Sequence, residues 1–199
     1  MASRLHTPGW TSTGFSLASD LSFVGSFRET DLGLVVERVD VTPINTRELD
    51  WERPEDERAS WKRKRLATAA GGERIGCSLY LLPPGERSWP YHYHTNNEEA
   101  MYVLSGSGTL RLDGETRSVS ADDYVSFPAD ESGAHRVIND GDEPLRYLLI
   151  STMSEPDVTV YPDSEKFGVY VGAPPGSDDK RVLDGYYRID DDVDYWDGE

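Results

Sequence analysis

The sequence predicts an all-β domain built from short antiparallel strands. Between residues 74 and 161, brief runs of β-branched, aromatic and alternating residues recur at close spacing, and turns rich in Gly, Asp, Asn and Pro separate them. No helical period interrupts this series, which disfavours a parallel α/β sheet. Many short strands in a chain of this length indicate a single antiparallel barrel or sandwich.

Successive strands are expected along most of this segment. A β-rich run at 74–82 stops at Pro83-Pro84-Gly85. Asp113-Gly114 lies between two alternating runs and predicts a two-residue hairpin turn, because both residues tolerate positive φ. The remaining expected strands are 99–104, 108–112, 116–120, 123–127, 134–139, 145–152, 157–161 and 167–171.

The two ends of the chain are expected to be less regular. Residues 1–30 are rich in Ser, Thr and Gly and predict an irregular arm, which a strand at 33–42 follows. Residues 46–70 are charged and lack strand periodicity, which favours a short helix at 56–69. The expected organisation is an arm, strand and short helix at 1–73, a barrel at 74–161 and an acidic extension at 162–199.

The chain is strongly acidic. It carries 20 Lys and Arg against 37 Asp and Glu, a formal charge of −17, which argues against nucleic acid or a membrane surface as a partner. An acidic surface with few lysines is typical of proteins adapted to concentrated salt, although a GC-rich genome produces a similar bias. The one basic run, at 62–65, is interpreted as a helix turn or as a local partner for the acidic segments.

Several features favour a cytoplasmic globular protein. The N-terminus lacks the apolar core of a secretory signal, and no apolar run approaches the ~18 residues of a membrane span. Cys77 is the only cysteine, so no disulfide can form within the chain. The 199 residues are enough to bury a core without disulfide or metal staples.

Three histidines and a glutamate are the candidate metal ligands of this sequence. His92 and His94 are two residues apart, so on a strand their imidazoles point to the same side. Glu98 or Glu99 can return a carboxylate to that space from the next strand, and His135 adds a third imidazole from a later one. Three imidazoles and one carboxylate suit a divalent transition metal (Fe, Mn, Zn, Ni or Cu) better than Ca or Mg.

The spacing around these residues resembles the two motifs of the cupin superfamily. Five positions fit the first motif: Gly85, His92, His94, Glu99 and Gly106. Four positions resemble the second motif, with a somewhat longer loop before its histidine: Pro128, Gly133, His135 and Asn139. The six residues between Glu99 and Gly106 match the first motif and favour Glu99 over Glu98 as a ligand.

This resemblance implies a double-stranded β-helix, or jelly roll, with a metal held by His92, His94, Glu99 and His135. Matches beyond the barrel, among them residues 161–164 and 195–199, are similar to a subgroup of small single-domain cupin-2 proteins without a settled function. Cupin barrels commonly pair by exchanging or adding N-terminal strands. We therefore expect a homodimer that uses the segment 1–42.

These observations predict a metalloenzyme that acts on a small organic molecule by dioxygenase-like or isomerase-like chemistry, since an open metal position beside a shaped cavity suits both. No catalytic residue beyond the ligands stands out. The alternatives are a non-catalytic module that binds a small molecule or sugar, and a purely structural barrel. Arg111, Arg117 and Arg136 are candidates for holding an anionic substrate group, but pairing with the excess acid is the simpler interpretation.

Overall fold

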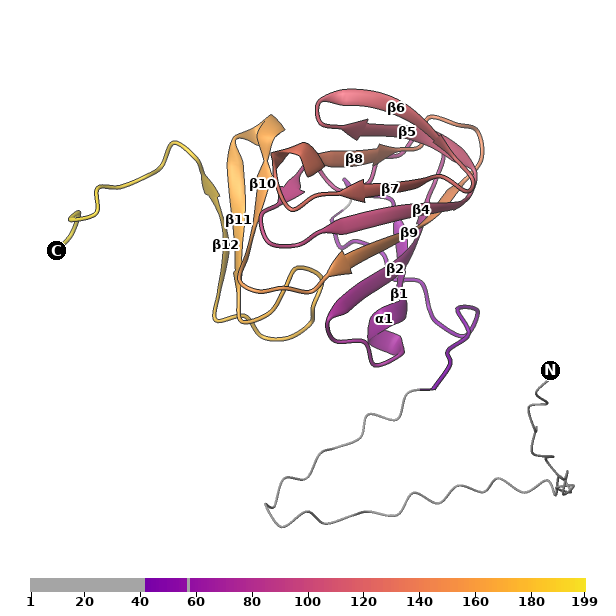
Figure 1. Cartoon of the computed structure of the whole chain (residues 1–199), viewed down its shortest axis with the longest axis horizontal. Coiled ribbons are helices and arrows are strands. Elements are labelled where there is room, and N and C mark those ends of the chain that lie inside the picture. The colour runs from indigo at the N-terminus through magenta and orange to yellow at the C-terminus, as the bar shows by residue number, and fades with distance from the viewer. Residues whose placement is uncertain (1–41, 57) are drawn as a thin grey trace, which may run out of the picture. The chain divides into compact units, whose positions relative to one another are not determined.

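A computed structural model describes residues 42–56 and 58–199 of the chain (Figure 1). The expected arm at 1–30 lies outside the described residues, as does the expected strand at 33–42 apart from its last residue. Within the described part, no helix is long and apolar enough to cross a membrane.

Antiparallel strands make up nearly all of the regular structure in the described residues. The α-helix α1 (Leu66–Ala69) has a single turn, and two 3-10 turns cover Glu131–Gly133 and Pro162–Ser164. The all-β prediction is confirmed. The strands are β1 (Lys62–Arg65), β2 (Ile75–Leu82), β3 (Tyr93–His94), β4 (Glu99–Ser105), β5 (Ser107–Leu112), β6 (Glu115–Ser120), β7 (Tyr124–Phe127), β8 (His135–Ile138), β9 (Leu145–Thr152), β10 (Asp157–Tyr161), β11 (Lys166–Val171) and β12 (Leu183–Arg188).

The strands form three sheets whose orders are β1-β2-β9-β4-β7, β6-β5-β8 and β12-β11-β10-β3. Figure 1 shows β5, β6 and β8 beside β7, β4, β9 and β2, with β10, β11 and β12 at one end of this body. The β5–β6 hairpin turns at Asp113 and Gly114, whose φ angles of 48° and 75° confirm the predicted two-residue turn.

The hydrophobic core lies between the first two sheets. Alternate residues of β4 point inward, so Met101 and Val103 are fully buried, while Tyr147 of β9 stacks on Tyr80 of β2 with ring centroids 5.3 Å apart. Burial of these side chains supplies most of the stability of the fold. The cluster consists of Trp61, Tyr80, Leu82, Met101, Val103, Leu110, Val119, Phe127, Val137, Leu145 and Tyr147.

The prediction of a helix at 56–69 is wrong for most of its length. Residues 62–65 form β1, which pairs antiparallel with β2, and only Leu66–Ala69 are helical. The pairing separates the basic run into two faces. Lys64 is buried, with Nζ 2.7 Å from the carbonyl oxygen of Thr46 and 4.7 Å from the centre of the Trp51 ring. Arg63 and Arg65 lie on the opposite face and form ion pairs with Glu52.

The segment 162–199, expected as an acidic extension, also contains regular structure. β11 was predicted, whereas β12 was not, and both continue the sheet that begins with β3 and β10. The residues that follow β12 are exposed and run away from the barrel (Figure 1). The C-terminal segment therefore adds strands beside the predicted barrel.

Candidate metal centre

Main-chain pairing places His92 opposite His135. The N–H of His92 donates to the carbonyl oxygen of His135 at 3.3 Å, and the N–H of His135 donates back at 2.9 Å. Residues paired in this way have side chains on the same face, and the two imidazole centroids are 4.8 Å apart. A bridge between segments 43 positions apart thus brings two of the predicted ligands together.

Each of these imidazoles has one nitrogen held by the backbone. Nδ1 of His92 lies 2.7 Å from the carbonyl oxygen of Pro90, and Nδ1 of His135 lies 2.9 Å from that of Gly133. A carbonyl only accepts, so each Nδ1 carries the proton and each Nε2 presents a lone pair. Burial lowers the pKa of both histidines, and their mutual proximity lowers that of His92 further. Both imidazoles are therefore neutral and able to bind a metal.

The turn before His135 depends on Gly133. A Cβ at this position would lie 2.0 Å from the carbonyl oxygen of Pro128, closer than any side chain can approach. On the other side, the Phe127 ring stacks on the His135 imidazole with centroids 3.8 Å apart. The imidazole is thus fixed by the backbone at one edge and by an aromatic face beneath it.

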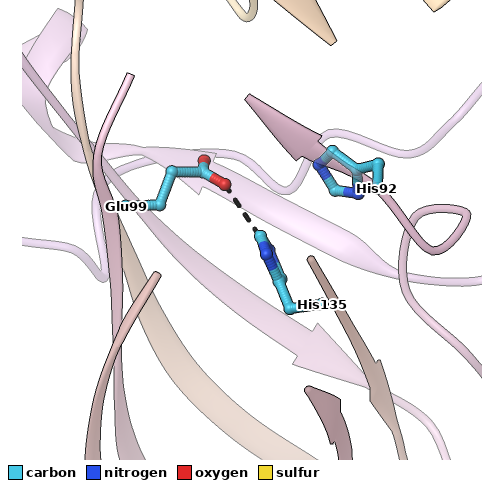
Figure 2. A group of neighbouring side chains, drawn as sticks. All are labelled: His92, Glu99 and His135. Carbon is cyan, nitrogen blue, oxygen red and sulfur yellow. Dashed lines mark ion pairs between the residues drawn. The ribbon is translucent and has the colours of Figure 1, made fainter. Parts of the chain in front are cut away.

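Glu99, the first residue of β4, completes a compact group with these histidines (Figure 2). One ligand atom from each of His92, Glu99 and His135 can be chosen so that all lie within 4.8 Å of one another. Oε2 of Glu99 is 3.5 Å from Nε2 of His135 and 3.6 Å from Nε2 of His94. This oxygen is buried and has no hydrogen-bond partner, which is costly for a carboxylate.

His94 lies at the edge of this group and is held differently. Its Nδ1 is 2.6 Å from Oδ2 of Asp157 and 3.1 Å from Oγ1 of Thr159, both on β10. Burial disfavours a charged His94, but the contacts with Asp157 and Glu99 outweigh it and raise the pKa of His94. His94 is absent from the tightest group, although its Nε2 faces the same Glu99 oxygen. We name His92, His94, Glu99 and His135 the ligand cluster.

Three members of the ligand cluster, His92, His94 and Glu99, line a cavity of about 320 Å³. The cavity is also lined by arginines from β1 and the loop 172–182 and by tyrosines from β10, β11 and β12. Burial raises the pKa of Tyr161 and Tyr170, so their phenols keep their protons and can donate hydrogen bonds. We name this set the outer wall: Arg63, Arg65, Arg181, Tyr161, Tyr170 and Tyr186.

Other sequence candidates lie elsewhere. Glu98 is exposed, and its hydrogen bonds come from its backbone: its N–H donates to Oγ1 of Thr152 at 3.1 Å, and its carbonyl oxygen accepts from the N–H of Thr152 at 3.0 Å. Arg111 binds both carboxylate oxygens of Asp163, and Arg117 contacts Glu115. Neither these arginines nor Arg136 line the cavity. Pairing with the acidic surface, the simpler interpretation, is therefore confirmed for Arg111 and Arg117.

The sequence analysis missed the residues of β10 that support the site. Asp157 is 1% exposed and also accepts a hydrogen bond from the N–H of Asn96 at 3.0 Å. Tyr161 stacks on the imidazole of His92 with centroids 5.8 Å apart. Asp157, Thr159 and Tyr161 are alternate residues of one predicted strand, and that shared face was the signal available in the sequence.

Comparison with known proteins assigns the barrel to a family. Residues 78–151 match the family model described as "Cupin domain". The polyketide synthase CurC of Streptomyces cyaneus is 41% identical over 71 residues, which are 36% of this chain and 44% of that protein. An uncharacterized protein of Methanocaldococcus jannaschii is 32% identical over 71 residues, 36% of this chain and 54% of that one. The chain thus spans about half the length of these curated relatives.

Solved structures extend the likeness beyond the barrel. A candidate sugar phosphate isomerase of Acidithiobacillus ferrooxidans superposes with a TM-score of 0.64 and 28% identity, covering 76% of this chain and 94% of that one. A sugar phosphate isomerase from a cupin superfamily, from Silicibacter pomeroyi, superposes with a TM-score of 0.65 at 21% identity, covering 78% and 98%. The second likeness concerns the fold alone. The antiparallel strands, the family match and these superpositions agree with the resemblance seen in the sequence: the protein contains a small cupin domain of the cupin-2 type.

Proposed function

We propose that this protein binds a divalent transition metal at the ligand cluster and acts as a metalloenzyme on a small organic molecule. The observation that carries the proposal is the buried Oε2 of Glu99, which has no hydrogen-bond donor and faces Nε2 of two histidines. A cation bound to these atoms would satisfy the carboxylate and the imidazole lone pairs together. The residue types therefore fit a metal.

His92, Glu99 and His135 would hold the metal, and His94 would complete the set. Fe, Mn, Zn, Ni and Cu all accept such ligands. When bound, the metal supplies a Lewis acid that polarises a substrate oxygen, and a redox-active ion adds electron transfer. The chain itself orients the imidazoles through Pro90, Gly133 and Asp157.

The outer wall has its own part in this function. The protonated phenols of Tyr161 and Tyr170 line the cavity and can donate hydrogen bonds to the oxygens of a bound molecule. The likeness to the Acidithiobacillus protein, at 28% identity over most of both chains, favours isomerase-like over dioxygenase-like chemistry. The alternative is a binding module that holds the same kind of molecule without turnover.

Elemental analysis of the untagged protein, purified without chelator, tests the metal site. We expect about one equivalent of a transition metal in the wild type and none in the His92→Ala, His135→Ala double variant. His6→Ala, which alters the remaining histidine of the chain, serves as the matched control and should retain the metal.

Absence of metal from the wild type, even after reconstitution, would contradict the proposal. If the metal is present, incubation with sugar phosphates separates the two functions. Turnover that is lost with the metal supports the enzyme. A ligand that raises the melting temperature and is recovered unchanged supports the binding module.

A further inference from the structure

The outer wall is basic although the chain is acidic. The residues that line the cavity include three arginines but a single carboxylate, Glu99, in a chain that holds 37 Asp and Glu against 20 Lys and Arg. A cavity lined by positive charge concentrates anions within it, and its partly enclosed walls strengthen the field. Basic side chains thus outnumber acidic ones in the lining, whereas the reverse holds for the whole chain.

Two of the three arginines are neutralised by carboxylates. Nε of Arg63 lies 3.0 Å from Oε2 of Glu52, and Nε of Arg65 lies 2.7 Å from Oε1 of the same residue. Nη1 of Arg65 also contacts Asp178. These contacts hold both guanidinium groups in the wall and offset most of their charge.

Arg181 differs from the other two arginines. Nε and Nη2 donate to the carbonyl oxygens of Ala173 and Pro174, at 3.2 and 3.1 Å. Its guanidinium carbon lies 4.9 Å from the centre of the Tyr170 ring. None of the carboxylates in the described part of the chain forms an ion pair with it. The group is therefore oriented by neutral partners and keeps its full charge.

A row of aromatic contacts connects Arg181 to the ligand cluster. The hydroxyl oxygens of Tyr170 and Tyr186 are 3.0 Å apart, and the Tyr186 and Tyr161 ring centroids are 5.9 Å apart. Tyr161 in turn stacks on His92. Arg181 and the ligand cluster thus belong to one cavity and are linked by this row of contacts, and the volume of the cavity is near the lower end of small-molecule sites.

We propose that Arg181 binds the anionic group, a phosphate or a carboxylate, of a small molecule whose other end reaches the ligand cluster. The guanidinium fork matches either oxyanion. The ring of Tyr170 lies against it, and the hydroxyl of Tyr170 contacts that of Tyr186, so both phenols line the same cavity as hydrogen-bond donors. Only the statement about the other end of the molecule rests on the proposed function. Binding of the anion by Arg181 can be measured separately.

Calorimetric titration of the full-length protein with inorganic phosphate, and in a second arm with succinate, tests the inference. The variant is Arg181→Gln, whose amide can still donate to the two carbonyl oxygens but carries no charge. Arg188→Gln, on the exposed end of β12 and outside the cavity lining, is the matched control. We expect Arg181→Gln to weaken anion binding about tenfold or more and Arg188→Gln to leave it unchanged. The anion that shows this loss identifies the group.

A second measurement needs no variant. Phosphate or succinate should slow the modification of Arg181 by phenylglyoxal in the wild type, as read by mass spectrometry, and should not protect Arg188. The inference is overturned if neither anion binds, if both variants bind equally well, or if Arg181 is not protected. Absence of metal from the protein would contradict the proposed function but not this inference, because Arg181 is not part of the ligand cluster. Phosphate that binds to the metal alone would bind equally to the wild type and to Arg181→Gln, so the variant also distinguishes that case.

Discussion

The ligand cluster and the outer wall face the same cavity but are built in different ways. The cluster is almost entirely buried, and each of its imidazoles has Nδ1 fixed by a carbonyl or by Asp157. The outer wall is partly exposed and comes from β1, from the loop 172–182 and from β10, β11 and β12. One side of the cavity is therefore rigid and the other accessible.

This difference separates two tasks. Metal binding needs several groups held within a fraction of an ångström, which packed strands provide. Selection of a small molecule needs side chains that reach from loops and strand ends, where changes cost little stability. Substitutions in the cluster or its supports should remove metal, whereas substitutions in the wall should change which ligand binds.

The largest effect on metal affinity is expected at Asp157, because its carboxylate holds Nδ1 of His94. Asp157 lies on β10, the strand that also carries Tyr161 of the outer wall. Asp157→Asn retains an acceptor for His94 but removes the negative charge at 2.6 Å. Loss of such a partner typically weakens metal affinity about 10- to 100-fold. Competition with a chromophoric chelator measures the change.

Asp163→Asn provides the control for this experiment. Asp163 pairs with Arg111 on the surface, and its loss should leave metal affinity unchanged. Equal metal affinities in Asp157→Asn and the wild type would show that the charge of Asp157 does not orient His94. β10 would then belong to the outer wall and not to the supports of the ligand cluster.

A smaller effect is expected at Gly133, which bears the carbonyl that holds His135. In Gly133→Ala the new Cβ meets backbone atoms of Pro128, so the turn must shift. We expect a loss of about 1–3 kcal/mol in the free energy of unfolding, together with weaker metal binding. Denaturant titration and chelator competition measure the two effects.

Ser132→Ala is the control for the same turn. It removes a hydrogen bond from Oγ of Ser132 to Oδ1 of Asp130 on the exposed side, which contributes at most about 1 kcal/mol. Its metal affinity should equal that of the wild type. If Gly133→Ala also binds metal normally, the contact between Nδ1 of His135 and the carbonyl oxygen of Gly133 is dispensable for metal binding. The orientation of His135 then has another source.

The cluster could be predicted from the sequence because its signals are local. Two histidines at alternate positions predict a shared face, and the spacing of the cupin motifs, which the sequence resembles, favoured Glu99 and added His135. The β5–β6 hairpin was predictable for the same reason, since Asp113 and Gly114 alone define its turn.

The outer wall could not be predicted because distant pairings create it. Residues 62–65 favour no particular element by themselves, and only their pairing with β2 makes them a strand that points Arg63 and Arg65 into the cavity. β12 has weak strand signals and is held by β11. Asp157 lay on a predicted strand, but no local signal shows that β10 pairs with β3 and so reaches His94.

The smallest effects on metal and stability are expected at Tyr170, where the comparison can be sharpened most. Tyr170→Phe keeps the ring beneath Arg181 and removes only the hydroxyl contact with Tyr186, whereas Tyr170→Leu also removes the ring. An exposed cation–π contact contributes about 0.5–1 kcal/mol, so Leu should be less stable than Phe by about that amount in denaturant titration. Both variants should bind metal as the wild type does. Loss of metal in Tyr170→Leu would mean that the row of contacts from Arg181 to His92 supports the ligand cluster. The geometry of the cluster would then depend on the outer wall.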